Sequence, residues 1–336
     1  MDARKKLCTS MALSAAIFFV CAASRAEDIK IGQLKTAGNG ATFVALDRGY
    51  FAAEGLSPIL VFFDAAQPIA VATVSGDVDI GATALTGGLY NLAAQGALRV
   101  IAAQSADAPS FQNNTVIVSN RAYESGLKSY ANLKGHSVAV TTIGSSPQYC
   151  IVLLSEKYRF NLQSIRFLPL QSNSNVISAV TGGQADAGVG PAAVFLPPVQ
   201  RGDAKLLGFV GDETPFQLGA VFVSSKTADQ RSDMIERFLR AYRKGARDYH
   251  DAFTGPGEKR QDGPTAPAIL AILAKHLDQT PEQLKMGISY VEAKGRLDVK
   301  DVQHQIDWYR AQGLLKGELA ASQLIDKRYA LALPEK

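Results

Sequence analysis

The feature that most constrains this chain is a short motif of glycine and aspartate that occurs twice. Residues 75–81 read SGDVDIG and residues 182–188 read GGQADAG, so both copies follow the pattern Gly-x-x-Asp-x-Gly. An apolar run precedes each copy, and helix-like sequence follows it. Alternating strand-like and helix-like segments around both copies are typical of α/β folds. We therefore predict two similar α/β lobes, each with a helix, a glycine stop and a short strand.

Strand-like and helix-like segments alternate through both halves, and the pattern then becomes helical. Residues 115–119 and 219–224 are strand-like and occupy matching positions between the halves, so we interpret them as two hinge strands. Apolar side chains from Met234 to Tyr249 keep helical spacing, as do residues 303–312, which predicts a helical C-terminal region. Other strands are predicted at residues 28–33, 58–63, 79–82, 137–141 and 165–170, and other helices begin near residues 42, 69, 86, 148 and 176.

The first 26 residues have the pattern of a secretory signal peptide. A basic start at residues 4–6, an apolar run at residues 11–23 and small residues at the cleavage point predict cleavage after Ala26 and a periplasmic protein. Lipid attachment at Cys21 is the alternative, although the Phe-Phe-Val before it lacks the small residue that this modification favours. The predicted domains are the signal peptide at 1–26, a first lobe at 27–116 and 222–336, and a second lobe at 117–221.

Charge and titratable side chains argue against several classes of function. Four of the 35 basic side chains and one of the 31 acidic ones lie in the predicted leader, so the mature chain is close to neutral and has no basic field for nucleic acid. Cleavage leaves Cys150 as the one cysteine of the mature sequence. The four histidines are scattered without metal-ligand spacing. We therefore expect no metal, no cofactor and no catalytic residues.

Thr141, Gly144, Ser145 and Ser146 are the strongest candidates for a binding site. Thr141 ends a predicted strand, and the other three start a predicted helix. This position brings backbone N–H groups, hydroxyl groups and the positive end of a helix dipole to one point, an arrangement that binds anions. An ordinary helix N-cap explains the same residues equally well.

Two helix starts in the first half are further candidates. Thr36 and Asn39 follow the first predicted strand, and Thr83 and Thr86 follow the first copy of the motif. The carboxyl ends of parallel strands face the ligand crevice in α/β folds, so these side chains should share one cleft with Ser145.

Asp79 and Asp186, one in each copy of the motif, allow two interpretations. A pair of carboxylates suggests acid–base chemistry. However, each lies in a glycine turn, where aspartate commonly accepts hydrogen bonds from backbone amides. We favour the structural interpretation, because two lobes need the same turn whereas one active site seldom needs it twice.

Several motifs in a fixed order resemble a known family. Together they are similar to the periplasmic solute-binding proteins of nitrate, taurine and alkanesulfonate import systems, a family that also contains binders of pyrimidine thiamin precursors. The resemblance implies a bilobal periplasmic binding protein fold, a ligand in the cleft between the lobes, and delivery to an ATP-driven permease. The motifs are IGQ at 31–33, DRGYFAAEGL at 47–56, SGDVDIG at 75–81, LKGHSVAV at 133–140 and GSSPQY at 144–149.

The resemblance also implies details of the site and its partners. By position, Gln33 and Pro191 are further ligand contacts; the expected partners are a permease and its ATPase at the inner membrane, and we expect a monomer. Pro147 and Gln148 stand where alanine and histidine are common, and Gly190 replaces an aromatic residue that often precedes the proline. We expect these departures to disfavour taurine or a simple sulfonate, and the small Gly190 to leave room for a bulkier ligand.

Three hypotheses for the function follow. The first is the substrate-binding component of an ABC importer for a small organic anion, such as a sulfonate or carboxylate, or a related polar solute, which binds by lobe closure without chemistry. The second is an enzyme on the same fold, of the thiamin-pyrimidine or menaquinone-pathway type. The export signal and the lack of a cysteine-rich or histidine-centred site weigh against it. The third is a sensor module that feeds a membrane kinase.

Overall fold

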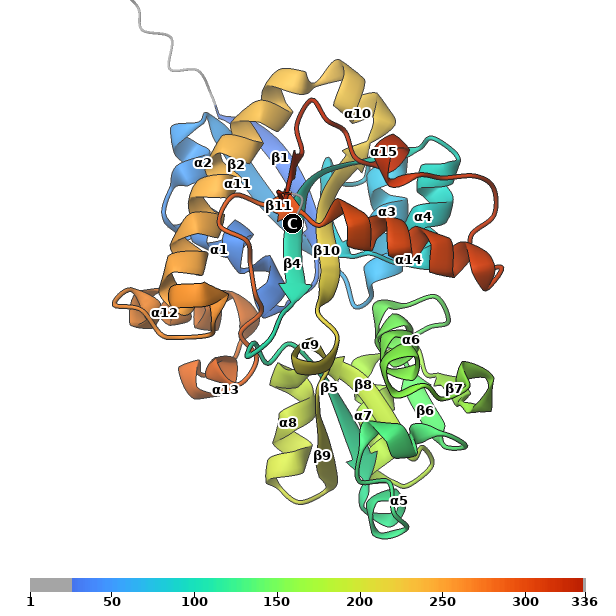
Figure 1. Ribbon diagram of the computed structural model, residues 1–336. Helices are drawn as coiled ribbons and strands as arrows, with labels where there is room; N and C mark the ends of the chain where they lie inside the picture. Colours follow the sequence, from blue (N-terminus) through green and yellow to red (C-terminus); the bar gives the residue numbers. More distant parts are fainter. Residues whose placement is uncertain (1–25, 335–336) are drawn as a thin grey trace, which may run out of the picture.

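Two five-stranded sheets organise the protein in the computed structural model, which describes residues 26–334 (Figure 1). Apart from Ala26, the predicted leader lies outside the described residues. The predicted α/β class is confirmed. The first sheet contains, in spatial order, β2 (Leu56–Phe62), β1 (Glu27–Gln33), β3 (Ile80–Ala84), β10 (Phe216–Ser224) and β4 (Leu98–Asp107), and the second contains β7 (Arg166–Pro169), β6 (Ser137–Val140), β8 (Ala187–Pro191), β5 (Asn114–Ser119) and β9 (Ala204–Phe209).

Both sheets follow the same plan. In each, the second strand in spatial order, β1 or β6, pairs in parallel with both neighbours, and the fourth strand, β10 or β5, runs antiparallel to the strands beside it. β5 belongs wholly to the second sheet and β10 wholly to the first. The chain therefore crosses between the lobes at residues 108–113 and 210–215, a few residues before the predicted boundaries at 116/117 and 221/222.

The C-terminal helices pack on the first lobe. α11 presents a continuous apolar face that includes Phe238, Tyr242 and Tyr249, and this face packs against α1 (Figure 1). α14 contacts α4 and β10. The first-lobe helices are α1 (Gly40–Asp47), α2 (Tyr50–Ala53), α3 (Ala66–Ser75) and α4 (Gly87–Ala94); the second-lobe helices are α5 (Asn120–Glu124), α6 (Ser146–Tyr158), α7 (Asn173–Thr181) and α8 (Ala192–Gln200). The short helix α9 (Val210–Glu213) lies in the second crossing segment. The C-terminal elements are α10 (Ser225–Gln230), α11 (Ser232–Phe253), α12 (Ala266–Leu277), α13 (Pro281–Lys285), α14 (Val299–Ala311), α15 (Ala321–Leu324) and the short pair β11 (Arg296–Leu297) and β12 (Leu331–Ala332).

The sequence pattern did not predict β4 or β9, the strands that flank the antiparallel strand at one edge of each sheet. β4 contains Ala102, Ala103 and Ala106, and alanine has a low β propensity. Pairing with β10 along the whole strand stabilises the extended conformation instead. Among residues 26–334, no helix combines the length and the hydropathy that a membrane span requires.

The repeated motif performs the same structural task in both lobes. Its first glycine, Gly76 or Gly183, has a positive φ (87° and 73°), which glycine adopts without strain. Its second glycine, Gly81 or Gly188, lies beneath the preceding helix, α3 or α7. An added Cβ there would come closer than 3.0 Å to a side chain of that helix. Each copy therefore ends a helix and lets it pack closely on the next strand.

Candidate functional site

A cavity of about 680 Å³ lies between the two lobes. Its wall combines residues that follow β1, β2 and β3 in the first lobe with residues that follow β6, β7 and β8 in the second. The carboxyl ends of both sets of parallel strands therefore meet at this cavity. Seven of the ten predicted contact residues line it: Thr36, Thr83, Thr86, Thr141, Ser145, Ser146 and Pro191.

The other three predicted residues, Gln33, Asn39 and Gly144, are not on the cavity wall. Gln33 is fully buried at the carboxyl end of β1, and its side-chain amide has no hydrogen-bond partner among the described residues. Asn39 donates from Nδ2 to the carbonyl of Leu34 (2.9 Å), and its Oδ1 accepts from Gln104 Nε2 (2.8 Å). Because Gln104 does line the cavity, Asn39 supports the wall from behind it.

At the predicted anion site, two of the backbone donors are engaged within the loop itself. The Gly144 N–H donates to Gln148 Oε1 (2.7 Å), and the Ser145 N–H donates to the carbonyl of Thr142 (3.3 Å). Pro147, in the first turn of α6, has no N–H. The start of α6 therefore offers fewer free backbone donors than the sequence indicates.

The sequence analysis missed a second set of polar residues on the wall. Gln104 and Ser105 lie in β4, a strand that was not predicted. Asn113 lies in the first crossing segment and Asn114 begins β5. The adjacent asparagines before the predicted strand at 115–119 were the signal that could have identified the latter pair. The missed polar residues are Asp64, Gln67, Asp77, Gln104, Ser105, Asn113, Asn114, Thr142, Gln171 and Asn173.

Three buried polar side-chain atoms of wall residues have no hydrogen-bond partner among residues 26–334. They are Thr83 Oγ1, Asn113 Nδ2 and Ser145 Oγ, whose residues have 1%, 8% and 4% of their surface exposed. A buried polar group without a partner costs free energy, so nearly all such groups in proteins are paired with protein, water or ligand. The wall is therefore suited to hydrogen-bonding a polar ligand from both lobes.

The charged residues on the wall are two exposed aspartates, Asp64 and Asp77. Asp77 accepts a hydrogen bond from Ser75 Oγ (2.7 Å). Within the described part of the chain, no lysine, arginine, histidine or cysteine lines the cavity. The cavity interior therefore contains hydroxyl and amide groups but no ionised side chain.

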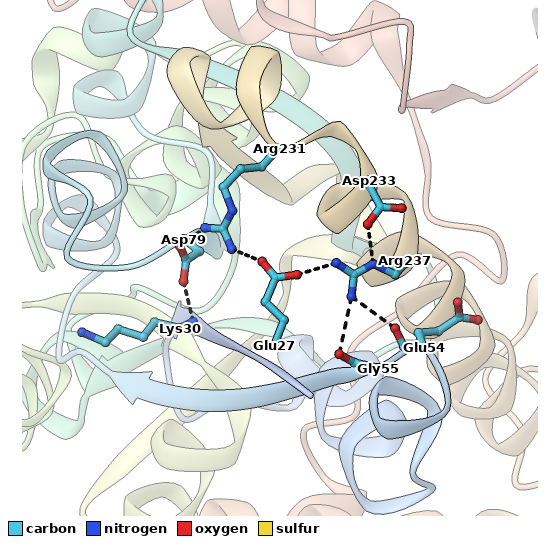
Figure 2. A network of polar contacts seen from close by, with 8 residues as sticks. All are labelled: Glu27, Lys30, Glu54, Gly55, Asp79, Arg231, Asp233 and Arg237. Carbon is cyan, nitrogen blue, oxygen red and sulfur yellow. Dashed lines mark hydrogen bonds and ion pairs between the residues drawn. The ribbon is translucent and has the colours of Figure 1, made fainter. Parts of the chain in front are cut away.

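The two aspartates of the repeated motif lie at the amino ends of the parallel strands, whereas the cavity lies at the carboxyl ends. Asp79 accepts a hydrogen bond from the Lys30 N–H in β1 (2.7 Å), and Arg231 pairs with its other oxygen (Figure 2). Asp186 accepts in the same way from the Ser137 N–H in β6 (2.9 Å). Each aspartate ties the loop before β3 or β8 to the neighbouring parallel strand, β1 or β6. This geometry supports the structural interpretation of both residues.

Burial and hydrogen bonding compete in setting the pKa values of these carboxylates. Burial alone would raise the pKa of Asp186, but the hydrogen bonds from Ser137 and the neighbouring His136 hold this pKa below its usual value. In the network of Figure 2, the hydrogen bond from Arg231 and that from Arg237 lower the pKa of Glu27.

Cys150 and the histidines lie away from the cavity wall. Cys150 is fully buried in α6, and burial raises the pKa of its thiol, so the thiol is unreactive. Among residues 26–334, no group of three histidine, cysteine or acidic side chains is arranged to hold a metal ion. The histidines contact other side chains: His136 with Asp186, His250 with Glu258, His276 with Asp47, and His304 with Tyr149.

The expectation that Gly190 leaves room for a ligand is wrong. An added Cβ at Gly190 would come within 2.3 Å of the Phe195 ring, so this ring already fills the space that a side chain would occupy. The missing side chain therefore accommodates the packing of α8 on β8.

The two lobes also touch beside the cavity. The Gly87 N–H at the start of α4 donates to the Gly144 carbonyl in the second lobe (2.9 Å). Tyr149 in α6 packs against Trp308 and Tyr309 of α14, with ring centroids 5.6 Å and 6.1 Å away. These contacts join the second lobe to the first at the start of α6.

Comparison with known proteins identifies a family model and similar folds. Residues 39–252 match the family described as NMT1/THI5 like. The ligand-binding component of an ABC-type import system from Staphylococcus aureus, with zinc bound, has a TM-score of 0.70 at 14% identity, covering 90% of this chain and 97% of that chain. The alkanesulfonate-binding protein SsuA from Xanthomonas axonopodis pv. citri, bound to MOPS, has a TM-score of 0.69 at 18% identity, covering 89% and 98%.

A third similar structure is the periplasmic nitrate-binding protein NrtA from Synechocystis PCC 6803, with a TM-score of 0.68 at 11% identity, covering 90% of this chain and 86% of that chain. No curated protein matches the sequence. At these identities the solved structures establish the fold, which is the bilobal periplasmic binding protein fold that the motifs predict.

Proposed function

Because this chain belongs to the NMT1/THI5-like family, we propose that it is the substrate-binding component of an ABC importer. The membership confirms the family resemblance predicted from the motifs. The observation that carries the proposal is the cavity, whose buried groups without partners come from both lobes: Thr83 from the first, Asn113 from a crossing segment and Ser145 from the second. A polar solute bonded to all three would link the lobes and stabilise a closed form that a permease can recognise.

The proposal includes export to the periplasm and a permease and ATPase at the inner membrane as partners. The leader pattern supports cleavage after Ala26, and β1 begins at the next residue, Glu27, whose N–H donates to the Gly55 carbonyl (2.9 Å). The exported protein should act as a monomer. Intact-mass measurement should give a chain that begins at Glu27, whereas a lipid on Cys21 would contradict this processing.

The rival function is an enzyme on the same fold. The cavity wall lacks histidine and cysteine among the described residues, which favours a binding protein. The test is incubation of the purified protein with a small-molecule extract of bacterial cells, followed by native mass spectrometry and release of the bound molecule. We expect one molecule that is recovered unchanged after prolonged incubation. A converted product, absent with heat-denatured protein, would establish an enzyme instead.

A further inference from the structure

The charges around the cavity disfavour an anionic ligand. Asp64 and Asp77 are exposed on the wall, and both repel an approaching anion. No cationic side chain among residues 26–334 lines the cavity to offset that repulsion. An anionic group taken into such a cavity would lose its hydration without gaining an opposite charge, which is strongly unfavourable. A cationic group would meet only Asp64 and Asp77, which are exposed to solvent, and attraction between charges at such exposed positions is weak.

The loop that could hold an anion through its backbone is filled from within the protein. The side chain of Gln148, 7% exposed, reaches back by four residues so that Oε1 accepts the Gly144 N–H (2.7 Å). This N–H is therefore engaged within the protein, and neither Gly144 nor Gln148 lines the cavity. Because the Gly144 and Ser145 N–H groups are engaged and Pro147 has none, the positive end of the helix dipole offers a ligand fewer N–H groups than the sequence indicates.

The remaining polar groups on the wall match an uncharged partner. The hydroxyls of Thr83 and Ser145 donate or accept, and Asn113 Nδ2 donates. Apolar side chains, among them Leu34, Phe63 and Leu218, complete the wall.

The size of the cavity also bears on the ligand. Its volume of about 680 Å³ lies within the range of about 300–1,000 Å³ that is usual for sites of drug-sized organic molecules. An inorganic anion or a two-carbon sulfonate would leave much of this space unfilled.

We infer that the cavity takes an uncharged organic molecule of intermediate size that carries hydroxyl or amide-like groups. The inference rests on the proposed solute-binding function and narrows its ligand. It replaces the organic anion that the sequence favours.

The first test uses the wild-type protein. A small-molecule extract of bacterial cells is equilibrated with the protein, the complex is isolated, and the molecule released by denaturation is identified by mass spectrometry and passed over ion exchangers at pH 7. We expect a molecule without a sulfonate, carboxylate, phosphate or ammonium group that neither exchanger retains. A bound molecule with an ionised group overturns this inference and leaves the solute-binding function intact. Recovery of no molecule counts against the solute-binding function itself.

The second test uses benzenesulfonate as an anionic probe of the cavity. Calorimetry with the wild-type protein should show no saturable binding, because no cationic side chain among residues 26–334 lines the cavity. Saturable binding that Thr83→Val weakens and Thr42→Val leaves unchanged would place the anion in the cavity and overturn the inference.

Discussion

Single side chains explain why one motif occurs twice in this chain. Asp79 and Asp186 accept hydrogen bonds from the backbone N–H groups of Lys30 in β1 and Ser137 in β6, which lie the same number of residues before them. The sequence separation is 49 in both lobes. The motif thus closes the same loop twice, and the aspartate that both copies share, Asp79 or Asp186, lies off the cavity wall.

Asp186→Ala tests this structural role. The substitution leaves the Ser137 N–H and hydroxyl without their acceptor, so we expect urea unfolding at pH 7 to show a loss of about 0.5–2 kcal/mol, by analogy with lost helix caps. Ligand affinity should stay unchanged, because Asp186 is remote from the cavity. Asp203→Ala, at an exposed aspartate of the same lobe, should be neutral. Normal stability with lost binding would show that the motif belongs to the ligand site.

Thr83→Val tests whether the Thr83 hydroxyl forms a hydrogen bond with the ligand. Valine keeps the shape but removes Oγ1, which has no partner among the described residues. We expect weaker binding of the recovered ligand, by about 0.5–1.5 kcal/mol for one hydrogen bond, with no loss of stability. Thr42→Val is the matched control, since Thr42 Oγ1 also lacks a partner there but lies off the cavity wall. If calorimetry shows equal ligand affinities for the two variants, the Thr83 hydroxyl does not contribute to ligand binding.

Among the elements, the crossing from β4 to β5 is held together by one buried carboxylate. Asp107 ends β4 in the first lobe, and Asn114 begins β5 in the second. The Asn114 N–H and Nδ2 both donate to Asp107, at 3.2 Å and 2.8 Å. This pair spans the crossing segment at 108–113 and fixes the position of Asn113 and Asn114 on the cavity wall.

Asp107→Asn tests the electrostatic cost of this pair. Burial raises the pKa of Asp107 from 3.8 to about 6, although the hydrogen bonds from Asn114 oppose the shift. A raised carboxyl pKa means that this group's stabilising contribution is present below the unfolded pKa and is lost as the pH rises through about 6. We therefore expect Asp107→Asn to exceed the wild type in stability at pH 8 by about 1–3 kcal/mol, and to match it near pH 4.

Urea unfolding at the two pH values measures this difference. Asp203→Asn, at an exposed site, should follow the wild type at both. A variant that is less stable than the wild type at pH 8 would mean that the ionised Asp107–Asn114 contact outweighs the burial of the charge.

At the scale of the whole molecule, the lobes are joined by two crossing segments and by the contacts at the start of α6. Tyr149 packs on α14, and its hydroxyl forms a hydrogen bond with His304 Nδ1 (2.8 Å). This aromatic contact belongs to a hydrophobic cluster that continues through both lobes. Because opening the cleft widely would break that cluster, we expect the lobes to move by a modest rotation.

The Gly87 amide reports on this motion. Its N–H donates to the Gly144 carbonyl across the lobes, so ligand that holds the lobes together should slow its hydrogen–deuterium exchange. The Ser119 N–H, which bonds to the Asp186 carbonyl within the second lobe, should exchange at the same rate with and without ligand. Small-angle scattering should show a slight compaction. Unchanged exchange at Gly87 would indicate that binding does not close the lobes.

Local patterns in the sequence determine the α/β class, the duplicated lobe and much of the site. Three features depend only on neighbours in the chain and can be predicted without a structure: short strands bounded by glycine, helical spacing in α11, and the two motif copies. The positions of Thr83, Thr86 and Ser145 at the cleft can also be predicted, because parallel strands direct their carboxyl ends to one cleft.

The tertiary structure decides the features that depend on residues far apart in the chain. β4 is a strand because β10 pairs with it, and Gln104 and Ser105 reach the wall only through that pairing. The space beside Gly190 is filled by Phe195, which the spacing of residues does not reveal. Whether the Gly144 N–H is hydrogen-bonded within the protein depends on the rotamer of Gln148. A hydrogen bond is directional and has a range of about 3 Å, so three-dimensional packing determines which donors remain for a ligand.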